Sequence, residues 1–314
     1  MSLGDLKHQN FNFTRSIKMK FNFKKTCIAL ALAGGFVSVA NAAPVVISKG
    51  GTSATIADSG LFSSSTGLGL SNGGVEYINL GTWSSNYTLR DIAGIIATAD
   101  QSSGLPDSSN PFSAVTTLGI SNSSYTSGSL KGWDFNMSET ITSPGHLVYV
   151  VTITNNTGHD VDGVRWGFGI DPDQGVPGGF GHGTTNVIDG VAALSSITAT
   201  SSDGYWVTLK GVTSGNAELA HPYVDPAFCC SPVDPLTMHL VDQGLGNYGF
   251  HDHSINIAFE LGKAGFMKNG ESSVLGYELV MGAVPEPETY AMFMTGLGLM
   301  GFIARRRKKF PSIT

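Results

Sequence analysis

The sequence predicts an all-β fold, an antiparallel β-sandwich or jelly roll, placed between two targeting segments. Along residues 43–283, apolar side chains recur at a period of two, and no comparable stretch repeats at the helical period. Clusters of Gly, Asn, Asp and Ser separate these stretches, as tight turns do. About ten short strands in one domain are typical of two packed antiparallel sheets.

Residues 1–42 are expected to be a leader that ends in a signal peptide. Basic residues between Lys18 and Lys25 precede an uncharged apolar run from Cys27 to Val39. Ala40, Ala42 and Ala43 then supply the small residues of a cleavage site. The pattern predicts export by the secretion machinery on a signal helix, with cleavage before Ala43.

The strands expected in the core differ in how they are patterned. Leu147–Thr154 is β-branched and apolar on both faces, which predicts a central strand. Ser254–Leu261 alternates, which predicts one buried face, and Val164–Ile170 sets large apolar residues opposite Gly167 and Gly169. Further strands are expected at Val75–Leu80, Ala114–Ile120, Leu130–Met137, Tyr205–Lys210, Leu236–Val241 and Val274–Met281. Asp91–Ala99 suits a helix or a strand equally.

The charge of the core restricts its partners. Between Ala43 and Ala283, seven basic residues face 21 acidic ones, a formal net charge of −14. Such a surface disfavours nucleic acid and anionic lipid, and favours cations or neutral partners. Aspartate outnumbers glutamate 15 to 6 in this region, which is expected where acids occupy turns.

A glycine-rich segment from Gly169 to Asn186 is the candidate cation site. Asp171 and Asp173 stand two residues apart, and glycines follow them. Ca²⁺ takes roughly six to eight oxygen ligands, many from backbone carbonyls, and a flexible loop can supply them. The alternative is a surface loop whose aspartates only bond to turn amides.

Histidine and cysteine offer weaker patterns. In an extended chain His251 and His253 point the same way, as two ligands of a transition metal would. His221, His239 and His182 are candidates for further ligands, and exposed turn histidines explain the pattern equally well. Cys229 and Cys230 are adjacent in an exported chain, where a strained vicinal disulfide, intermolecular bridges or two buried thiols all fit.

The C-terminal segment from Val284 to Lys309 has three parts. Pro285, Glu286 and Pro287 precede 15 apolar or small residues, Tyr290–Ala304, and a basic cluster, Arg305–Lys309, follows. The apolar run is short for a full membrane span, and its cations are expected to remain cytoplasmic.

These parts resemble the PEP-CTERM sorting signal, with Pro285, Glu286, Pro287 and the cluster Arg305, Arg306, Arg307 in the family's order. The resemblance implies an exosortase as partner, a short transmembrane helix as a transient inner-membrane anchor, and a Gram-negative host that makes extracellular polysaccharide. The protein would then reach the cell surface or the extracellular space. Residues 284–310 are expected to form this signal, behind a secreted domain of residues 43–283.

Within that domain, Val148–Val164 resembles a hairpin of Ig-like modules in bacterial surface proteins, which agrees with the sandwich. The sequence contains no nucleophile elbow, phosphate loop or dinucleotide fingerprint. Trp83, Trp133, Trp166 and Trp206 are candidate sugar platforms, although Trp133 and Trp166 alternate like core residues.

We therefore expect a non-enzymatic binding or structural protein associated with extracellular matrix and exopolysaccharide, with Ca²⁺ as the only candidate cofactor. The alternatives are a secreted metal-dependent hydrolase that uses the histidines, and a purely structural or adhesive matrix protein. Bound metal together with turnover would favour the hydrolase, whereas retention on a polysaccharide without turnover would favour the binder.

Overall fold

The computed structural model describes residues 43–63, 69–78, 85–100, 111–118, 122–174, 183–190, 195–212, 220–226, 233–241, 243–283 and 287–307. The predicted leader, with Ala40 and Ala42, lies outside the described residues, and Ala43 is the first residue inside them. Cys229, Cys230, His182, Trp83, Pro285 and Glu286 also lie outside.

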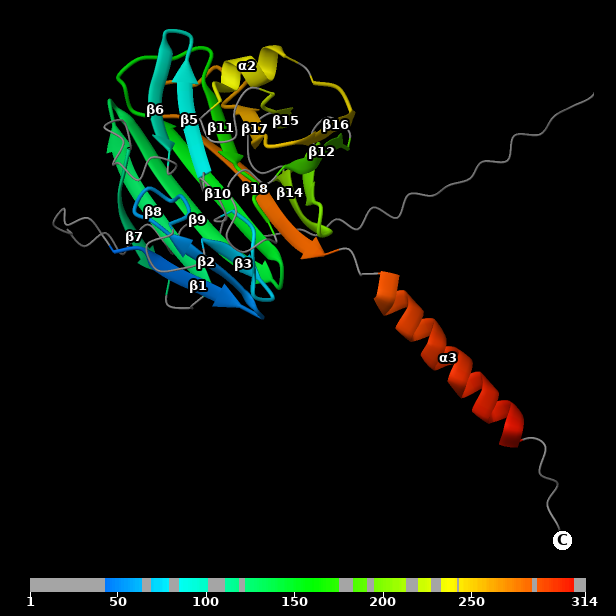
Figure 1. Cartoon of the computed structure of the whole chain (residues 1–314). Coiled ribbons are helices and arrows are strands. Elements are labelled where there is room, and N and C mark those ends of the chain that lie inside the picture. The colour runs from blue at the N-terminus through cyan, green and yellow to red at the C-terminus, as the bar shows by residue number, and fades with distance from the viewer. Residues whose placement is uncertain are drawn as a thin grey trace, which may run out of the picture. The chain divides into compact units, whose positions relative to one another are not determined.

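The described core consists of three antiparallel sheets (Figure 1). The large sheet has nine strands in the order β16 (Gly246–His251), β12 (Thr184–Asp189), β13 (Ser196–Ser201), β14 (Tyr205–Val212), β18 (Ser272–Ala283), β10 (His146–Asn155), β9 (Trp133–Ser143), β8 (Ser123–Leu130) and β7 (Phe112–Thr117). The middle sheet has five, β15 (Ala220–Val224), β17 (Ile255–Glu260), β11 (Arg165–Ile170), β5 (Ser85–Asp91) and β6 (Gly94–Asp100). The small sheet contains β1 (Val45–Lys49), β2 (Thr52–Ile56), β3 (Leu70–Asn72) and β4 (Val75–Glu76).

The large and middle sheets pack through aromatic side chains, as in a β-sandwich. Phe168 of β11 stacks on Tyr277 of β18, with ring centroids 4.4 Å apart, and Tyr277 stacks on Tyr149 of β10 at 4.8 Å. Tyr87 of β5 stacks on Trp166 of β11 at 4.7 Å. All five side chains are buried, so the inner faces of the two sheets form one core. The predicted sandwich architecture is thus confirmed in its main lines.

Several predicted strands are confirmed in place. Leu147–Thr154 falls inside β10, which lies between β9 and β18 in the interior of the large sheet. Ser254–Leu261 contains β17, and its apolar positions 255, 257, 259 and 261 are buried. The ambiguous segment Asp91–Ala99 forms the hairpin of β5 and β6, because Asp91 Oδ1 accepts hydrogen bonds from the amides of residues 93 and 94 in the turn.

The strand predicted at Leu236–Val241 is wrong, since this segment contains the helix α2 (Pro235–Leu240). Asp234 caps the helix by accepting a hydrogen bond from the Leu236 amide at 2.9 Å, and Pro235 occupies the first turn, where its fixed φ suits a helix. The buried Met238 packs α2 onto the middle sheet. A cap and a proline therefore outweighed the alternation of apolar residues.

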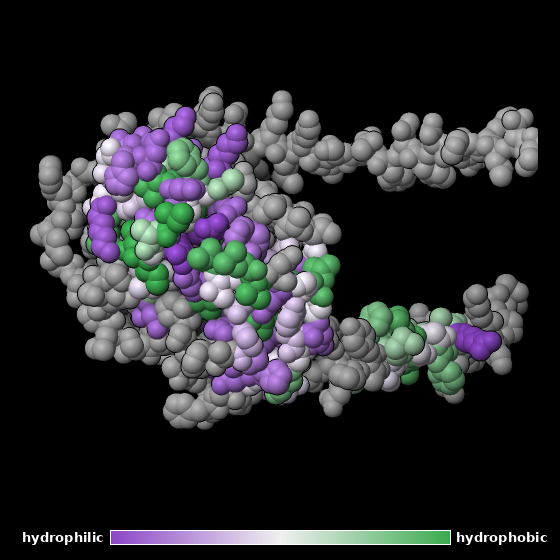
Figure 2. All heavy atoms as spheres, turned by 90° about the horizontal axis from the view of Figure 1, so that it is seen from above, coloured by the Kyte–Doolittle hydropathy of each residue, from purple (hydrophilic) through white to green (hydrophobic). Residues whose placement is uncertain are grey.

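A second helix, α3 (Pro287–Arg307), contains the predicted apolar run of the tail. Its apolar side chains, from Met292 to Ile303, are exposed along the helix, shown in green in Figure 2. Arg305 is exposed at the C-terminal end of that run. Across the described ranges, no helix combines the length and the apolar character that crossing a bilayer requires.

Candidate functional site

The candidate cation site forms where two neighbouring strands of the middle sheet meet their loops. β11 ends at Ile170, which pairs with Ile255 at the start of β17. The chain leaving β11 and the chain entering β17 therefore run side by side, antiparallel. This register brings Asp171 and Asp173 next to Asp252, although about 80 residues of sequence separate them.

The three carboxylates lie within 4.8 Å of one another. Asp171 and Asp173 are 2% and 1% exposed, whereas Asp252 is exposed. Burial, and then repulsion by Asp173 and Asp252, raises the pKa of Asp171 to about 9. A divalent cation is the ligand that would stabilise three clustered carboxylates, and oxygen donors are what Ca²⁺ takes. The oxygen donors of this site are therefore of the type that binds a hard cation such as Ca²⁺.

Sequence reasoning found two members of this group and missed the third. The two-residue spacing of Asp171 and Asp173 on a glycine-rich segment predicted a shared cation, and the structure brings the two carboxylates together. Asp252 lies between His251 and His253, about 80 residues further along the chain, so no local spacing connects it to the other two. Asp252 could have been found only from the register of β11 on β17, in which Ile170 pairs with Ile255.

The predicted histidine ligands lie beside this site as a stacked pair. The rings of His251 and His253 are 4.8 Å apart and 20° from parallel. Burial and the nearby His251 lower the pKa of His253, and Asp225 and Asp252 partly oppose this. Among described residues, the aspartate trio is the group of at least three His, Cys, Asp or Glu side chains that could hold a metal ion, and it includes neither histidine.

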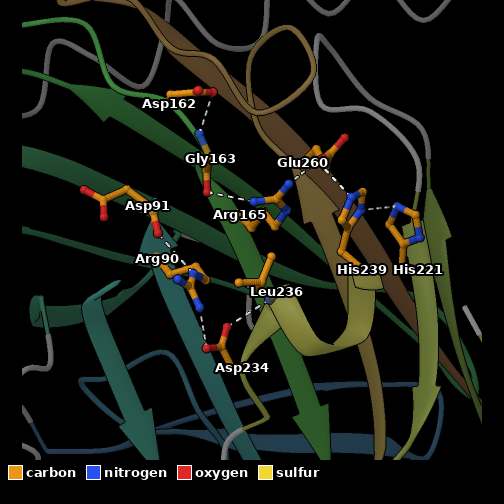
Figure 3. A network of polar contacts seen from close by, with 10 residues as sticks. All are labelled: Arg90, Asp91, Asp162, Gly163, Arg165, His221, Asp234, Leu236, His239 and Glu260. Carbon is orange, nitrogen blue, oxygen red and sulfur yellow. Dashed lines mark hydrogen bonds and ion pairs between the residues drawn. The ribbon is translucent and has the colours of Figure 1, made fainter. Parts of the chain in front are cut away.

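His239 on α2 and His221 on β15 form a separate pair (Figure 3). His239 Nδ1 lies 3.2 Å from His221 Nε2, and His239 Nε2 lies 3.6 Å from Glu260 Oε1. Arg165 holds the same carboxylate oxygen at 2.8 Å. His239 thus presents its two nitrogens to two different neighbours, which is an ion-pair and hydrogen-bond chain rather than a metal site. The candidates His221 and His239 thus pair with each other and do not join the pair of His251 and His253, and His182 lies outside the described residues.

On the outer face of the middle sheet, next to the aspartates, the side chains are polar and buried. Asn256 Nδ2 donates to Ser254 Oγ at 2.9 Å, which directs its Oδ1 toward Gly169 of β11. A Cβ at Gly169 would lie 1.9 Å from Asn256 Oδ1 and 3.1 Å from Asn86 Oδ1. Only glycine therefore leaves room at this position for the buried side chains of Asn256 and Asn86. The alternation of Gly167 and Gly169 with large residues was the sequence signal for this close approach.

Another buried acid, Glu139, lies on the inner face of the large sheet, and no sequence pattern had singled it out. Ser124, Glu139, Tyr149 and Tyr277 form one row across four strands of the large sheet on its inner face. Ser124 Oγ donates to Glu139 Oε2 at 2.5 Å, and Thr126 Oγ1 donates to Oε1 at 3.4 Å. Burial raises the pKa of Glu139 to about 8, and these hydrogen bonds oppose the shift. The carboxyl is therefore largely protonated at neutral pH.

Of the tryptophans predicted as candidate sugar platforms, those that the structure describes lie in two different environments, the core and the outer face of the large sheet. Trp133 and Trp166 are 2% and 0% exposed, and both belong to the core. Trp206 lies on the outer face of β14, because its neighbour Val207 is fully buried on the inner face and side chains alternate along a strand.

Comparison with solved structures gives only distant likeness. A heparan sulfate lyase mutant from Pedobacter heparinus is 9% identical with a TM-score of 0.37, covering 63% of this chain and 24% of the lyase. A putative aldose 1-epimerase from Escherichia coli K12 is 9% identical with a TM-score of 0.41, and an aldose epimerase homologue from C. elegans is 8% identical with a TM-score of 0.39. Each covers 77% of this chain and 99% of its own. At TM-scores below 0.5 these likenesses carry no functional argument.

No curated protein sequence matches the chain significantly. The tail gives a specific result, because residues 283–308 match the model of the PEP-CTERM protein-sorting motif. This range holds Pro285, Glu286 and Pro287, the apolar residues of α3 and the arginines from Arg305 to Arg307. The chain therefore carries a PEP-CTERM protein-sorting motif at its C-terminal tail, which indicates an exported surface protein that an exosortase sorts.

Proposed function

We propose that this protein is an exosortase substrate whose β-sandwich serves in the extracellular matrix as a non-enzymatic binding module that contains a Ca²⁺ site. The match of residues 283–308 to the sorting motif is the observation that carries the proposal. In this scheme the signal peptide exports the chain, the sorting tail keeps it transiently at the inner membrane, and processing near Pro285-Glu286-Pro287 releases the sandwich toward the surface.

The sorting step is tested by replacing Pro285, Glu286 and Pro287 with alanine in the exosortase-bearing host. The variant is expected to be exported and to remain in the inner-membrane fraction, whereas the wild type reaches the surface or medium. Mass spectrometry of the released wild type is expected to find Ala43 at its N-terminus. Pro311→Ala, which lies beyond the matched residues, is the matched control and is expected to behave like the wild type. Equal release of the triple-alanine variant would contradict the proposal.

The Ca²⁺ site is supported by Asp171, Asp173 and Asp252, which lie within 4.8 Å of one another. Two of them are buried, where water solvates an ionised carboxylate poorly, and a bound cation would stabilise their ionised form. In the sequence, a glycine-rich segment follows Asp171 and Asp173 directly, and Ca²⁺ takes oxygen donors of the kind that carboxylates and backbone carbonyls provide.

Melting curves of the full chain with millimolar Ca²⁺ and with chelator test this site. An ion at 100 times its dissociation constant stabilises the folded state by about 2.7 kcal/mol, which raises the midpoint by roughly 5–10 °C. Asp171→Asn combined with Asp173→Asn is expected to remove that rise. Asp203→Asn, in the exposed turn between β13 and β14, is expected to keep it. Coincident wild-type curves with and without Ca²⁺ would return the aspartates to an ordinary structural role.

A further inference from the structure

A row of uncharged residues crosses one end of the large sheet on its outer face. It runs from Gly282 of β18 through Trp206 of β14, Thr200 of β13 and Thr185 of β12 to Phe250 of β16. Residues paired across antiparallel strands point to the same side of a sheet, so these side chains share the outer face. The inner face of the same strands is occupied by Val207, Ala199 and other buried apolar residues.

Both aromatic rings of this row lie over a glycine of a neighbouring strand. A Cβ built on Gly282 would lie 2.4 Å from Cζ2 of Trp206, and one built on Gly183 would lie 2.8 Å from Cε1 of Phe250. Any other residue at either glycine would therefore displace the ring. Phe250 is 54% exposed, and Trp206 is partly exposed. Because the two glycines have no side chain, each ring can pack directly against the backbone.

The spacing of the rings suits an extended ligand. Trp206 and Phe250 are three strand intervals apart, which is about 14 Å at the usual separation of paired strands. The hydroxyl groups of Thr200 and Thr185 lie between them in the row. The adjacent row consists of Val280, Thr208, Thr198, Val187 and Asn247 and is also uncharged.

We infer that this row, the Trp206–Phe250 platform, binds a chain of neutral polysaccharide. Sugar rings present C–H faces that pack on aromatic rings, and their hydroxyl groups pair with threonine hydroxyls. The charge of the protein points to a neutral chain, because neither row holds a cation and residues 43–283 carry −14. This inference rests on the proposed matrix function and identifies the class of ligand.

The inference is tested by affinity electrophoresis of the full chain through gels that contain a polysaccharide, in a detergent without a sugar head group. The panel consists of hydroxyethyl cellulose, laminarin and galactomannan as neutral chains and alginate as an anionic one. Retardation by at least one neutral polysaccharide and none by alginate is expected. Trp206→Ala and Phe250→Ala are each expected to weaken binding about tenfold. The double variant is expected to weaken it about a hundredfold, because the sites are far enough apart to be additive.

Two further variants separate a binding role from a structural one. Gly282→Ala keeps the tryptophan but lifts its ring, and is expected to weaken binding about as much as removing the ring. Tyr125→Ala removes an aromatic side chain from the outer face of β8, at the other end of the large sheet, and is expected to bind like the wild type. Urea midpoints of all variants show whether each remains folded, and the exposure of Phe250 makes it the safest replacement.

The inference fails if no neutral polysaccharide retards the protein, if alginate retards it equally, or if Trp206→Ala and Phe250→Ala bind like the wild type. Analytical ultracentrifugation shows whether the protein forms a dimer. A dimer that Trp206→Ala abolishes would assign the platform to a second copy of this chain and would overturn the inference. The binding assay uses purified protein and does not depend on sorting in the host. A negative binding result would therefore not contradict the sorting proposal, and a negative sorting result would not affect the binding assay.

Discussion

Replacing Glu139 with glutamine is expected to remove a pH-dependent loss of stability. Burial raises the pKa of this carboxyl from 4.5 to about 8 in the folded protein. Between these two values the folded state binds a proton that the unfolded state has lost, so the free energy of unfolding falls as pH rises. A shift of this size corresponds to about 5 kcal/mol in total, at about 1.4 kcal/mol per pH unit. The loss is complete above about pH 8.

Glutamine has nearly the same shape and does not ionise; its one carbonyl oxygen can accept from Ser124 or Thr126, and its NH2 group can donate to the other hydroxyl. Wild type and Glu139→Gln are therefore expected to have similar stability near pH 5 and to diverge steadily up to pH 8, with the variant more stable at the alkaline end. Other groups titrate as well, so the informative quantity is the difference between the two proteins.

The assay is urea denaturation of the full chain at several pH values between 5 and 9, followed by the fluorescence of the buried Trp133 and Trp166. Glu271→Gln, in the exposed turn before β18, is the control and is expected to follow the wild type at every pH. Parallel curves for wild type and Glu139→Gln would refute the reasoning, because they would mean that Glu139 ionises without cost inside the sandwich.

Two further predictions concern local packing. Gly169→Ala would place a methyl group 1.9 Å from Asn256 Oδ1 and is expected to destabilise the protein by about 1–3 kcal/mol in urea unfolding, whereas Gly244→Ala, which meets nothing within 4 Å, is expected to be nearly neutral. Asp234→Ala removes the N-cap of α2 and the ion pair with Arg90, and a loss of about 1–2 kcal/mol is expected by the same measurement; no change would show that α2 is held by Met238 alone.

Much of the sandwich was predictable from local pattern. Alternation, which reports which face of a strand is buried, identified β17, and a β-branched run that is apolar on both faces identified β10. Alternation could also have found Glu139, which takes an inward position between Met137 and Ile141 in β9. α2 was mistaken for a strand because six residues are too few to show a helical period, and its cap and proline were the better signal.

The candidate site was predictable only where its members are close in sequence. Asp171 and Asp173 are two residues apart, and the amide of Asp173 donates to the carbonyl oxygen of Asp171 at 3.1 Å, so a local turn keeps them close. Asp252 joins them through the register of β17 on β11, which no local pattern reveals. The separation of His221 and His239 from His251 and His253 likewise depends on α2 folding over β17, which is a tertiary contact.

The position of β18 has a mechanical consequence. This strand leads at Ala283 into the sorting tail. Its residues 272–280 pair with β10 on one side, and its residues 276–283 pair with β14 on the other. Its 12 residues span about 40 Å. A force that pulls on the tail along the strand loads both ladders of hydrogen bonds in shear, so that many bonds resist together rather than opening one after another. The tail thus extends from an interior strand that can leave its sheet only by breaking both ladders.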